Sequence, residues 1–518
     1  MPSLATLGLL SGVALLLWRI FRSYIVKSPL DNIPGPARTS FWKGDIPALF
    51  HRNGWNFHDE ATERYGQAFK FHGPLGAKGL YVYDPKALGS IIVKDQMIYE
   101  EPSWFISLNP VFSIAHMRHM TPLFYETTHR LRRAVTTQVA GGSSEVDILN
   151  WMSRTALELV GQGGLGYSFD LLEKDIPNPF GDALKRYLPL NFALQLWRMF
   201  SPYFTKCGPP GLRRFVAKFL PYSKMQQLRE IVDTLDYQSR KVYNQKKVAL
   251  EKGDAAVVQQ IGEGKDIISI LMQANMDASD EDRLPEDELI AQMSTLVFAA
   301  TDTTSNALAR TFHLLAEHPD VQEKIRAELL AVGGNDDIPY DQLVDLPYLD
   351  AVCRETLRLH PPVSFLSRET RADVVMPLSQ PIHCVDGSIM NEIPVPKDTT
   401  VIIGIRGCNR NKAIWGEDAL EWKPERWLSP LPKSVPDARV PGVYSNLMTF
   451  LGGGRACIGF KFSQLEMKVV LAVLLRSFRV TLSDKEIVWN LAGVNYPTVG
   501  REASRPSMPL KLEPINLA

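Results

Sequence analysis

Apolar residues recur at helical spacing over several long stretches of the chain. Patterns with a period near 3.6 residues, separated by polar or Pro/Gly-rich connections, predict helices over Asp147–Gly161, Tyr222–Leu250, Asp266–Met276, Pro285–Glu317, Tyr348–Leu359 and Gly459–Phe478. Alternating or aromatic-rich runs predict short strands at Ala68–His72, Leu80–Tyr83 and Thr399–Ile403. The pattern therefore predicts a mainly α fold with a small β-sheet.

The helix expected over Pro285–Glu317 is unusually long. Pro285 suits its first position, acidic residues follow at 286–288, and His318-Pro319 ends it. A helix of about 50 Å is long enough to cross a whole domain. Within it, apolar Leu296–Ala300 leads into polar Thr301–Ser305. Buried polar groups need partners, so these hydroxyls either bond carbonyls one turn earlier or take part in chemistry.

The first residues predict a membrane anchor. Pro2–Trp18 carries no charge and would form a helix of about 25 Å, just enough for a thin bilayer. Arg19, Arg22 and Lys27 follow it, and positive charge on this flank places the rest of the chain in the cytosol. We expect an anchor over 1–23, a basic and Pro/Gly hinge over 24–36, and one folded domain over 37–518. A core helix is the alternative.

Charge and cysteine content exclude other classes of protein. With 57 Lys and Arg against 57 Asp and Glu, the net charge is zero, so no overall field attracts nucleic acid. Five cysteines, none in a CxxC pair, argue against a disulfide framework and a structural zinc site: Cys207, Cys353, Cys384, Cys408 and Cys457. The folded part is expected in a reducing compartment.

One of these cysteines lies in the strongest motif. It is Phe450-Leu-Gly-Gly453-Gly-Arg455-Ala-Cys457-Ile-Gly459, directly before a predicted helix. Backbone N–H groups at a helix start stabilise a thiolate, glycines let a loop approach a flat cofactor, and an arginine can bind a carboxylate. A cysteine thiolate is a known axial ligand of haem iron, and haem carries two propionates. A buried free cysteine is the alternative.

This motif resembles that of the haem-thiolate monooxygenases, the cytochrome P450 superfamily, in its membrane-bound fungal type. The resemblance runs from Pro34 to the C-terminus and implies a P450-like single catalytic domain with haem b. It implies that Cys457 ligates the iron, Arg455 meets a propionate, Phe450 shields the sulfur, and Gly453 and Gly459 belong to the cofactor loop.

The resemblance also assigns the polar patch in the long helix. Ala299–Thr304 is similar to the family's oxygen-binding motif, which implies Thr303 as the proton-relay hydroxyl and Asp302 as its acidic partner. The family usually has glycine where this chain has Ala300, which leaves a slightly narrower oxygen groove.

Glu355-Thr-Leu-Arg358 resembles the family's ExxR ion pair, completed by an arginine from Pro424-Glu-Arg-Trp427. Glu323…Arg326 and Glu502…Arg505 fit the pattern equally well, and position alone favours residue 355. Arg368 resembles a second propionate contact, although an exposed loop arginine would look the same.

The chain contains no Gly-rich flavin or nicotinamide fingerprint and no cysteine cluster for iron–sulfur. A separate reductase is therefore expected, by resemblance the membrane-bound NADPH–cytochrome P450 reductase of the endoplasmic reticulum. It would dock on the Cys457 face, where Lys461 and Lys468 could meet it, or these lysines form an ordinary solvated face.

The substrate is indicated only by class. The apolar stretch Leu188–Leu220 corresponds to a zone that in the family forms a lid and dips into the membrane, although an internal core helix pair would have the same composition. A lipophilic substrate follows: a terpenoid, steroid, fatty acyl or polycyclic aromatic compound, in secondary metabolism or xenobiotic oxidation.

The resemblance breaks after Pro102. Only Ser103–Leu108 separates Pro102 from the stretch Asn109-Pro-Val-Phe-Ser113, where the family has a distal loop and a haem-contacting helix. His129–Arg133 follows this stretch and is interpreted as a surface basic cluster. Either codons of an intact enzyme are missing from this sequence, or the chain is a truncated, weakly active or inactive haem-binding relative. Some relatives rearrange hydroperoxides without a reductase, but they tend to lose the threonine present here as Thr303.

Overall fold

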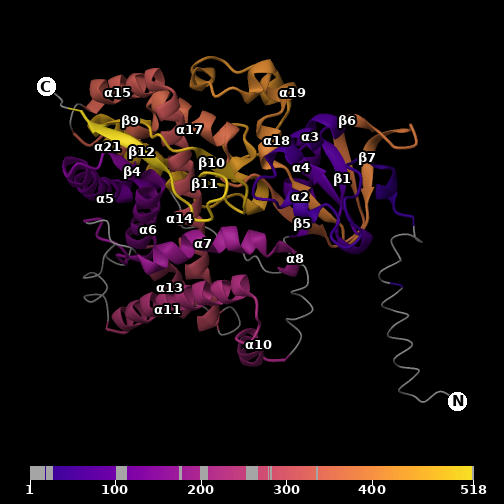
Figure 1. Cartoon of the computed structure of the whole chain (residues 1–518), viewed down its shortest axis with the longest axis horizontal. Helices are drawn as coiled ribbons and strands as arrows, with labels where there is room; N and C mark the ends of the chain where they lie inside the picture. The colour runs from indigo at the N-terminus through magenta and orange to yellow at the C-terminus, as the bar shows by residue number, and fades with distance from the viewer. Residues whose placement is uncertain are drawn as a thin grey trace.

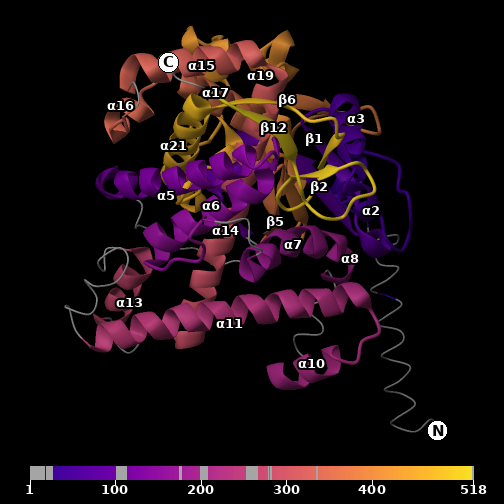
Figure 2. The same ribbon diagram turned by 60° about the vertical axis from the view of Figure 1, so that its left-hand side comes forward.

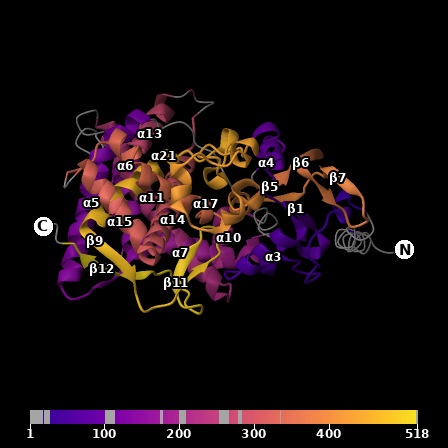
Figure 3. The same cartoon turned by 90° about the horizontal axis from the view of Figure 1, so that it is seen from above.

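Helices predominate in the described part of the protein, and the largest sheet lies at one end while the β4-β12-β9 sheet lies among the long helices at the other. The computed structural model describes residues 27–100, 114–173, 178–198, 208–252, 266–277, 283–333 and 336–515, together with Trp18 and Ser279. Figure 1 shows the largest sheet with α2–α4 at one end and the long helices at the other. The view from above shows the same division along the longest axis (Figure 3).

The described helices are α2 (Ile46–Leu49), α3 (Trp55–Tyr65), α4 (Pro85–Gly89), α5 (Ile114–Ala140), α6 (Ile148–Leu165), α7 (Pro179–Ala193), α8 (Gln195–Arg198), α10 (Pro210–Ala217), α11 (Ser223–Glu251), α13 (Ile267–Asp277), α14 (Glu286–Glu317), α15 (Pro319–Gly333), α16 (Tyr340–Val344), α17 (Pro347–Leu359), α18 (Ile405–Asn409), α19 (Lys412–Trp415), α20 (Ser434–Asp437) and α21 (Phe460–Ser477). All six helices expected from the sequence are present. Their observed ends mostly differ from the expected ones by only one or two residues.

The strands form one five-stranded sheet and three smaller ones. The large sheet has the order β1-β2-β8-β5-β3 and the small ones pair β6 with β7, β10 with β11, and β12 with β4 and β9. Their bounds are β1 (Ala68–His72), β2 (Lys78–Val82), β3 (Tyr99–Glu100), β4 (Glu145–Asp147), β5 (Leu366–Thr370), β6 (Val374–His383), β7 (Ile389–Val395), β8 (Thr400–Ile403), β9 (Phe478–Leu482), β10 (Ile487–Asn490), β11 (Tyr496–Val499) and β12 (Pro509–Pro514). The three strands expected from the sequence all lie in the large sheet, where β1 and β2 are antiparallel and β2 and β8 are parallel.

Helix α14 runs through the middle of the molecule. It packs against α6, α7, α11, α17 and α21, and Figure 2 shows it passing from the level of α11 up towards α17. Glu286, Asp287 and Glu288 occupy its first turn, and His318 is its C-cap residue, as the sequence predicts. At 32 residues, α14 is the longest described helix, and many of its side chains are buried in the interior.

The expected anchor over 1–23 lies outside the described residues apart from Trp18. Within the part of the chain that the structure describes, no helix is both long and apolar enough to cross a bilayer. The described end of the expected hinge packs on the body: Lys70 donates its backbone N–H to the Pro34 carbonyl at 2.9 Å, and Lys78 forms an ion pair with Asp31.

The break expected after Pro102 also lies outside the described residues, which resume at Ile114. Helix α5 begins there and carries His129–Arg133. Only part of that cluster is on the surface. Arg133 is exposed, whereas Leu131 is buried and Arg130 lies 3.8 Å from the buried Glu158 carboxylate. The surface interpretation is therefore wrong for Leu131 and Arg130.

Candidate active site

The loop that carries Cys457 is built against the sheet end of the molecule. The Cys457 backbone N–H donates to the Phe450 carbonyl at 2.8 Å, which closes the loop just before α21 begins at Phe460. The Phe450 ring is buried, with its centroid 5.6 Å from that of Tyr444 and 6.0 Å from that of Phe460. Cys457 is thus held beside Phe450 at the start of α21.

Gly453 is required by the path of this loop. Its φ is +66°, a conformation that disfavours residues with a side chain, and an added Cβ would lie 2.0 Å from the Ile92 carbonyl oxygen. Gly459 has different surroundings. A Cβ added at Gly459 would meet no atom of the described residues within 4 Å. Gly459 therefore borders open space, which is what a residue beneath a flat cofactor requires.

The Cys457 thiol faces the same kind of space. Among the described cysteines, Cys353, Cys384 and Cys408 are buried and Cys457 is exposed. Nevertheless burial raises the pKa of the Cys457 thiol, while a hydrogen bond from the Gly459 backbone N–H lowers it. The two observations agree if the sulfur is surrounded by protein but faces a hollow. These residues fit a haem with a sulfur ligand.

A second open surface occurs on α14. Thr295 and Ala299 are exposed and Thr303 is partly exposed, although α14 is central and its neighbouring residues Leu296 and Asp302 are buried. The exposed residues are spaced four apart and form one stripe along the helix. Because α14 lies in the middle of the molecule, we infer that this exposed stripe borders an internal hollow. The Thr303 hydroxyl donates to the Ala299 carbonyl at 2.7 Å, the local back-bonding that the sequence allows.

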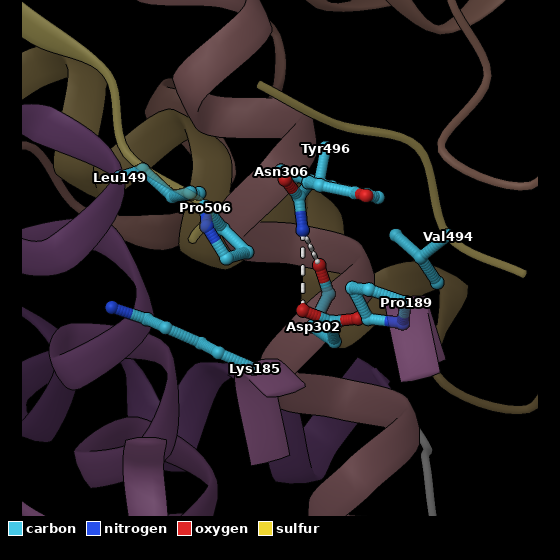
Figure 4. A pocket seen from close by; sticks show the side chains of 8 residues that line it. All are labelled: Leu149, Lys185, Pro189, Asp302, Asn306, Val494, Tyr496 and Pro506. Atoms are coloured by element: carbon cyan, nitrogen blue, oxygen red, sulfur yellow. Dashed lines mark hydrogen bonds between the residues drawn. The ribbon is translucent and has the colours of Figure 1, made fainter. Parts of the chain in front are cut away.

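Asp302 occupies a different cavity. A small, partly open space lies beside it, lined by residues of α6, α7, α14 and the C-terminal segment: Leu149, Lys185, Pro189, Asp302, Asn306, Val494, Tyr496 and Pro506 (Figure 4). The Asn306 amide nitrogen donates to the Asp302 carbonyl at 2.8 Å and to its carboxylate at 3.2 Å. No direct hydrogen bond joins the Asp302 and Thr303 side chains among the described residues.

The environment of Asp302 changes its titration. Burial raises the pKa of this carboxyl to about 7, against the lowering effects of the Lys185 charge and the Asn306 hydrogen bond. The Lys185 ammonium is partly buried, and this desolvation lowers its pKa; it donates to the Asn150 side chain at 3.0 Å. Asp302 can therefore hold or release a proton near neutral pH. Sequence reasoning missed Lys185 and Asn306, and Asn306 could have been found from its place one turn after Asp302.

The two expected propionate arginines reach one edge of the large sheet. Arg455 donates to the Tyr99 carbonyl on β3 at 3.1 Å. Tyr99 pairs with Thr370 on β5, two residues beyond Arg368. Arg368 is a buried strand residue, not an exposed loop arginine. Both guanidinium-bearing residues therefore approach the β3–β5 edge from separate elements.

The ExxR pair is confirmed as an ion-pair network. The Arg358 guanidinium donates twice to the Glu355 carboxylate, each time at 2.8 Å, and both side chains are 0% exposed. Arg426 lies 3.4 Å from Glu355, and the Trp427 indole donates to it at 3.0 Å. Glu323–Arg326 also forms, but its carboxylate is half exposed. Burial, not the pattern, therefore distinguishes the structural pair.

Lys468 does not lie on a docking face. Its side chain is 3% exposed, its ammonium lies 2.8 Å from the Asp350 carboxylate, and it donates to the Val344 carbonyl. The expectation that Lys468 meets a reductase is therefore wrong. Helix α21 is buried on nearly all sides, so a charged residue on it needs an internal partner. Lys461, with its ammonium 5.7 Å from the Phe460 ring centroid, is partly exposed.

Comparison with known proteins decides the family. The family model for cytochrome P450 matches residues 106–493. This chain belongs to the cytochrome P450 family. It is 54% identical to cytochrome P450 monooxygenase 91 of Postia placenta (strain ATCC 44394 / Madison 698-R), with 98% of each chain covered. It is also 46% identical to ganoderic acid synthetase CYP5150L8 of Ganoderma lucidum, again with 98% of each covered.

A more distant relative is the cytochrome P450 monooxygenase eriI of Hericium erinaceus, 37% identical with 94% of each chain covered. The enzyme is thus a cytochrome P450 monooxygenase, an oxidoreductase of small molecules, and the family's general cofactor is haem b with a cysteine ligand. The alignment with the Postia monooxygenase spans 532 positions, more than the 518 residues of this chain. That relative therefore contains residues that have no counterpart in this P450.

Proposed function

We propose that this P450 inserts one oxygen atom from O₂ into a lipophilic small molecule. The electrons come from NADPH through a separate, membrane-bound NADPH–cytochrome P450 reductase. The substrate class is a terpenoid, steroid, fatty acyl or polycyclic aromatic compound. The observation that carries the proposal is the Cys457 thiol, exposed to a hollow at the start of α21 in a chain 54% identical to a named monooxygenase.

Each residue of the proposed cofactor site has its own role. Cys457 ligates the iron, with its thiolate stabilised by the Gly459 N–H, and Phe450 covers the sulfur. Arg455 and Arg368 bind the propionates at the β3–β5 edge. Gly453 shapes the loop, and Gly459 leaves room for the ring. When bound, haem supplies a thiolate-ligated iron at which O₂ is activated.

Thr303 and Asp302 supply protons in this proposal. The Thr303 hydroxyl lies on the exposed stripe of α14 and can exchange its bond to Ala299 for one to a group in the hollow. Asp302 holds a proton near neutral pH in the neighbouring cavity. Because the two side chains share no hydrogen bond, water or a rotation of Asp302 must connect them. Asn306 orients the carboxyl.

The surface around α10 supports entry of the substrate from lipid. The first half of the apolar stretch contributes Phe192 and Leu194 to the interior, and the second half leaves large apolar side chains exposed. The exposed ones there are Leu212, Phe215, Val216 and Phe219, and Trp197 on α8 is exposed as well. Such a patch favours contact with a membrane. Together with an anchor over 1–23, it would hold the domain 37–518 on the cytosolic face of the endoplasmic reticulum.

Reconstitution with purified NADPH–cytochrome P450 reductase and NADPH tests the reaction. Microsomes containing the full chain are given one compound from each lipophilic class, and a ganoderic acid precursor is included because one relative is named for that synthesis. Product that contains one atom of labelled O₂, depends on reductase and falls in the Thr303→Val variant is the expected result. Conversion of a hydroperoxide without reductase would overturn the monooxygenase proposal.

A second candidate function is a haem-binding chain with little or no turnover. It is favoured by one observation: the alignment with the Postia relative is longer than this chain. We place the missing residues after Pro102, in the distal loop and the haem-contacting helix. Sequencing the transcript across codons 95–120 distinguishes the two candidates. A message that joins Pro102 closely to Asn109, with haem uptake but no NADPH-driven product, supports the second; extra codons there support the first.

A further inference from the structure

A second cavity lies behind Asn306, beyond the one that contains Asp302. This small cavity is partly open and lies between α3, α14, the end of α17, α18 and the β10–β11 hairpin. Its polar wall consists of Asn306, Arg310, Arg406 and Asn495, and two tryptophan rings, Trp55 and Trp489, complete it. No step proposed above uses this cavity.

Positive charge in this cavity lacks compensation. The Arg310 guanidinium lies 4.3 Å from the Trp489 ring centroid and donates to His360 Nδ1 at 3.0 Å. Arg410 donates to the same nitrogen at 3.4 Å. Because burial and the nearby arginines hold the pKa of His360 well below its usual range, this ring is a neutral acceptor and provides no negative charge.

The surrounding carboxylates do not fill this role. Asp59 is bound by two nitrogens of the Arg406 guanidinium and so neutralises Arg406. Among the described residues, neither Arg310 nor Arg410 has a carboxylate within ion-pair distance. Arg310 and Arg410 are both partly buried, and withdrawing a guanidinium from water without a counter-charge is unfavourable. Burial lowers the pKa of Arg310 to about 9, which still leaves it charged at neutral pH.

Two unpartnered amide oxygens also face this region. Asn306 is 4% exposed and Asn495 is 8% exposed, and no described residue donates a hydrogen bond to the Oδ1 atom of either. Figure 4 shows the Asn306 nitrogen turned towards Asp302 and its oxygen turned away. The Asn495 amide nitrogen donates to the Pro361 carbonyl and to the Ser364 hydroxyl. Acceptors of this kind require water or another donor in the cavity.

We propose that this cavity binds a compact, hydrated anion, either an inorganic anion or a small carboxylate, with Arg310 as its principal ligand. The anion compensates the charge of Arg310, and its accompanying water donates to Asn306 and Asn495. The two tryptophans limit the size of the occupant. The inference is independent of the proposed reaction, because neither haem nor electron transfer enters it.

Thermal unfolding of the purified full chain tests the site. The midpoint temperature is followed as chloride or acetate replaces gluconate, which is too bulky for the cavity, at constant ionic strength. A saturable rise of about 2 °C is expected for the wild type. Arg310→Met should abolish the rise, whereas Arg505→Met, which removes an exposed arginine, should retain it. A response to chloride identifies an inorganic occupant, and a response to acetate alone identifies a carboxylate.

The absence of a rise in the wild type, or an equal rise in Arg310→Met, would overturn the proposal. Should Arg310→Met fail to fold, crystals of the wild type soaked in bromide provide the second measurement. An anomalous peak within hydrogen-bond reach of the Arg310 guanidinium supports the site. A cavity without such a peak contradicts it.

Discussion

Replacing Asp302 by asparagine is expected to stabilise the protein at neutral and alkaline pH. The Asp302 pKa of about 7 lies roughly three units above its ordinary 3.8, because the carboxyl is buried in the cavity shared with Asn306. Three units correspond to about 4 kcal/mol of unfolding free energy. Lys185 loses a nearby negative charge in the variant, so the expected net gain is about 2–4 kcal/mol.

The sign of this effect fixes its pH dependence. The folded state binds the proton more tightly than the unfolded state, so the wild type loses stability as pH rises from about 4 to about 7 and loses no more above that. The measurement is the difference in thermal midpoint between Asp302→Asn and the wild type from pH 5 to pH 8.5. It should favour the variant and grow with pH up to about 7.

Thr303→Val provides the matched control, because it changes the adjacent residue without adding or removing a titrating group. Its difference from the wild type should not vary with pH. A difference for Asp302→Asn that is constant across the same range would refute the argument that Asp302 is neutral in the folded protein at low pH.

Three further substitutions test other parts of the account. Arg358→Met should lower the unfolding free energy by about 3–5 kcal/mol, because it leaves the buried Glu355 carboxylate without its bidentate partner; thermal or denaturant unfolding measures the loss. Gly453→Ala should destabilise the cofactor loop by more than about 1 kcal/mol, since its φ is +66° and its Cβ would meet a carbonyl; haem content and thermal midpoint report it. Lys468→Met should lower the thermal midpoint because Asp350 loses its buried ammonium partner and keeps only Arg354, with no change in the reductase concentration required for half-maximal turnover.

Matched variants sharpen these three tests. Glu323→Gln, which breaks the half-exposed pair, should have a much smaller effect than Arg358→Met. Gly211→Ala should be nearly neutral, because a Cβ there meets no atom within 4 Å. Lys461→Met serves as the comparison for reductase dependence. An equal loss of stability in Arg358→Met and Glu323→Gln, or in Gly453→Ala and Gly211→Ala, would contradict the reasoning. Weaker reductase binding by Lys468→Met but not by Lys461→Met would contradict it as well.

Periodicity in the sequence predicted the long elements well. Helix α14 was expected over Pro285–Glu317 and is found over Glu286–Glu317, because its acidic first turn and His318-Pro319 mark its ends. The sequence prediction missed α5, a helix of 27 residues with Pro122 inside it. It also missed the β6–β7 hairpin, whose Pro377 and bulge interrupt the alternation. Local pattern fails where long-range packing overrides a helix or strand breaker.

The candidate site shows the same limit. The cysteine motif located Cys457 and its glycines directly, since spacing along one loop carries that information. Neither the separation of Asp302 from Thr303 into two cavities nor the Asp350 partner of Lys468 is encoded in local spacing. Such partners come from distant segments, and only the folded chain brings them together.

The central claim is that the Cys457 sulfur binds haem iron as a thiolate. The most direct measurement is the reduced, carbon monoxide difference spectrum of microsomes that contain the wild type, compared with those that contain Cys457→Ser. The wild type should give the red-shifted Soret band of a thiolate-ligated haem, and the serine variant should lack it. An identical spectrum for the two proteins, or no such band in the haem-loaded wild type, would contradict the claim.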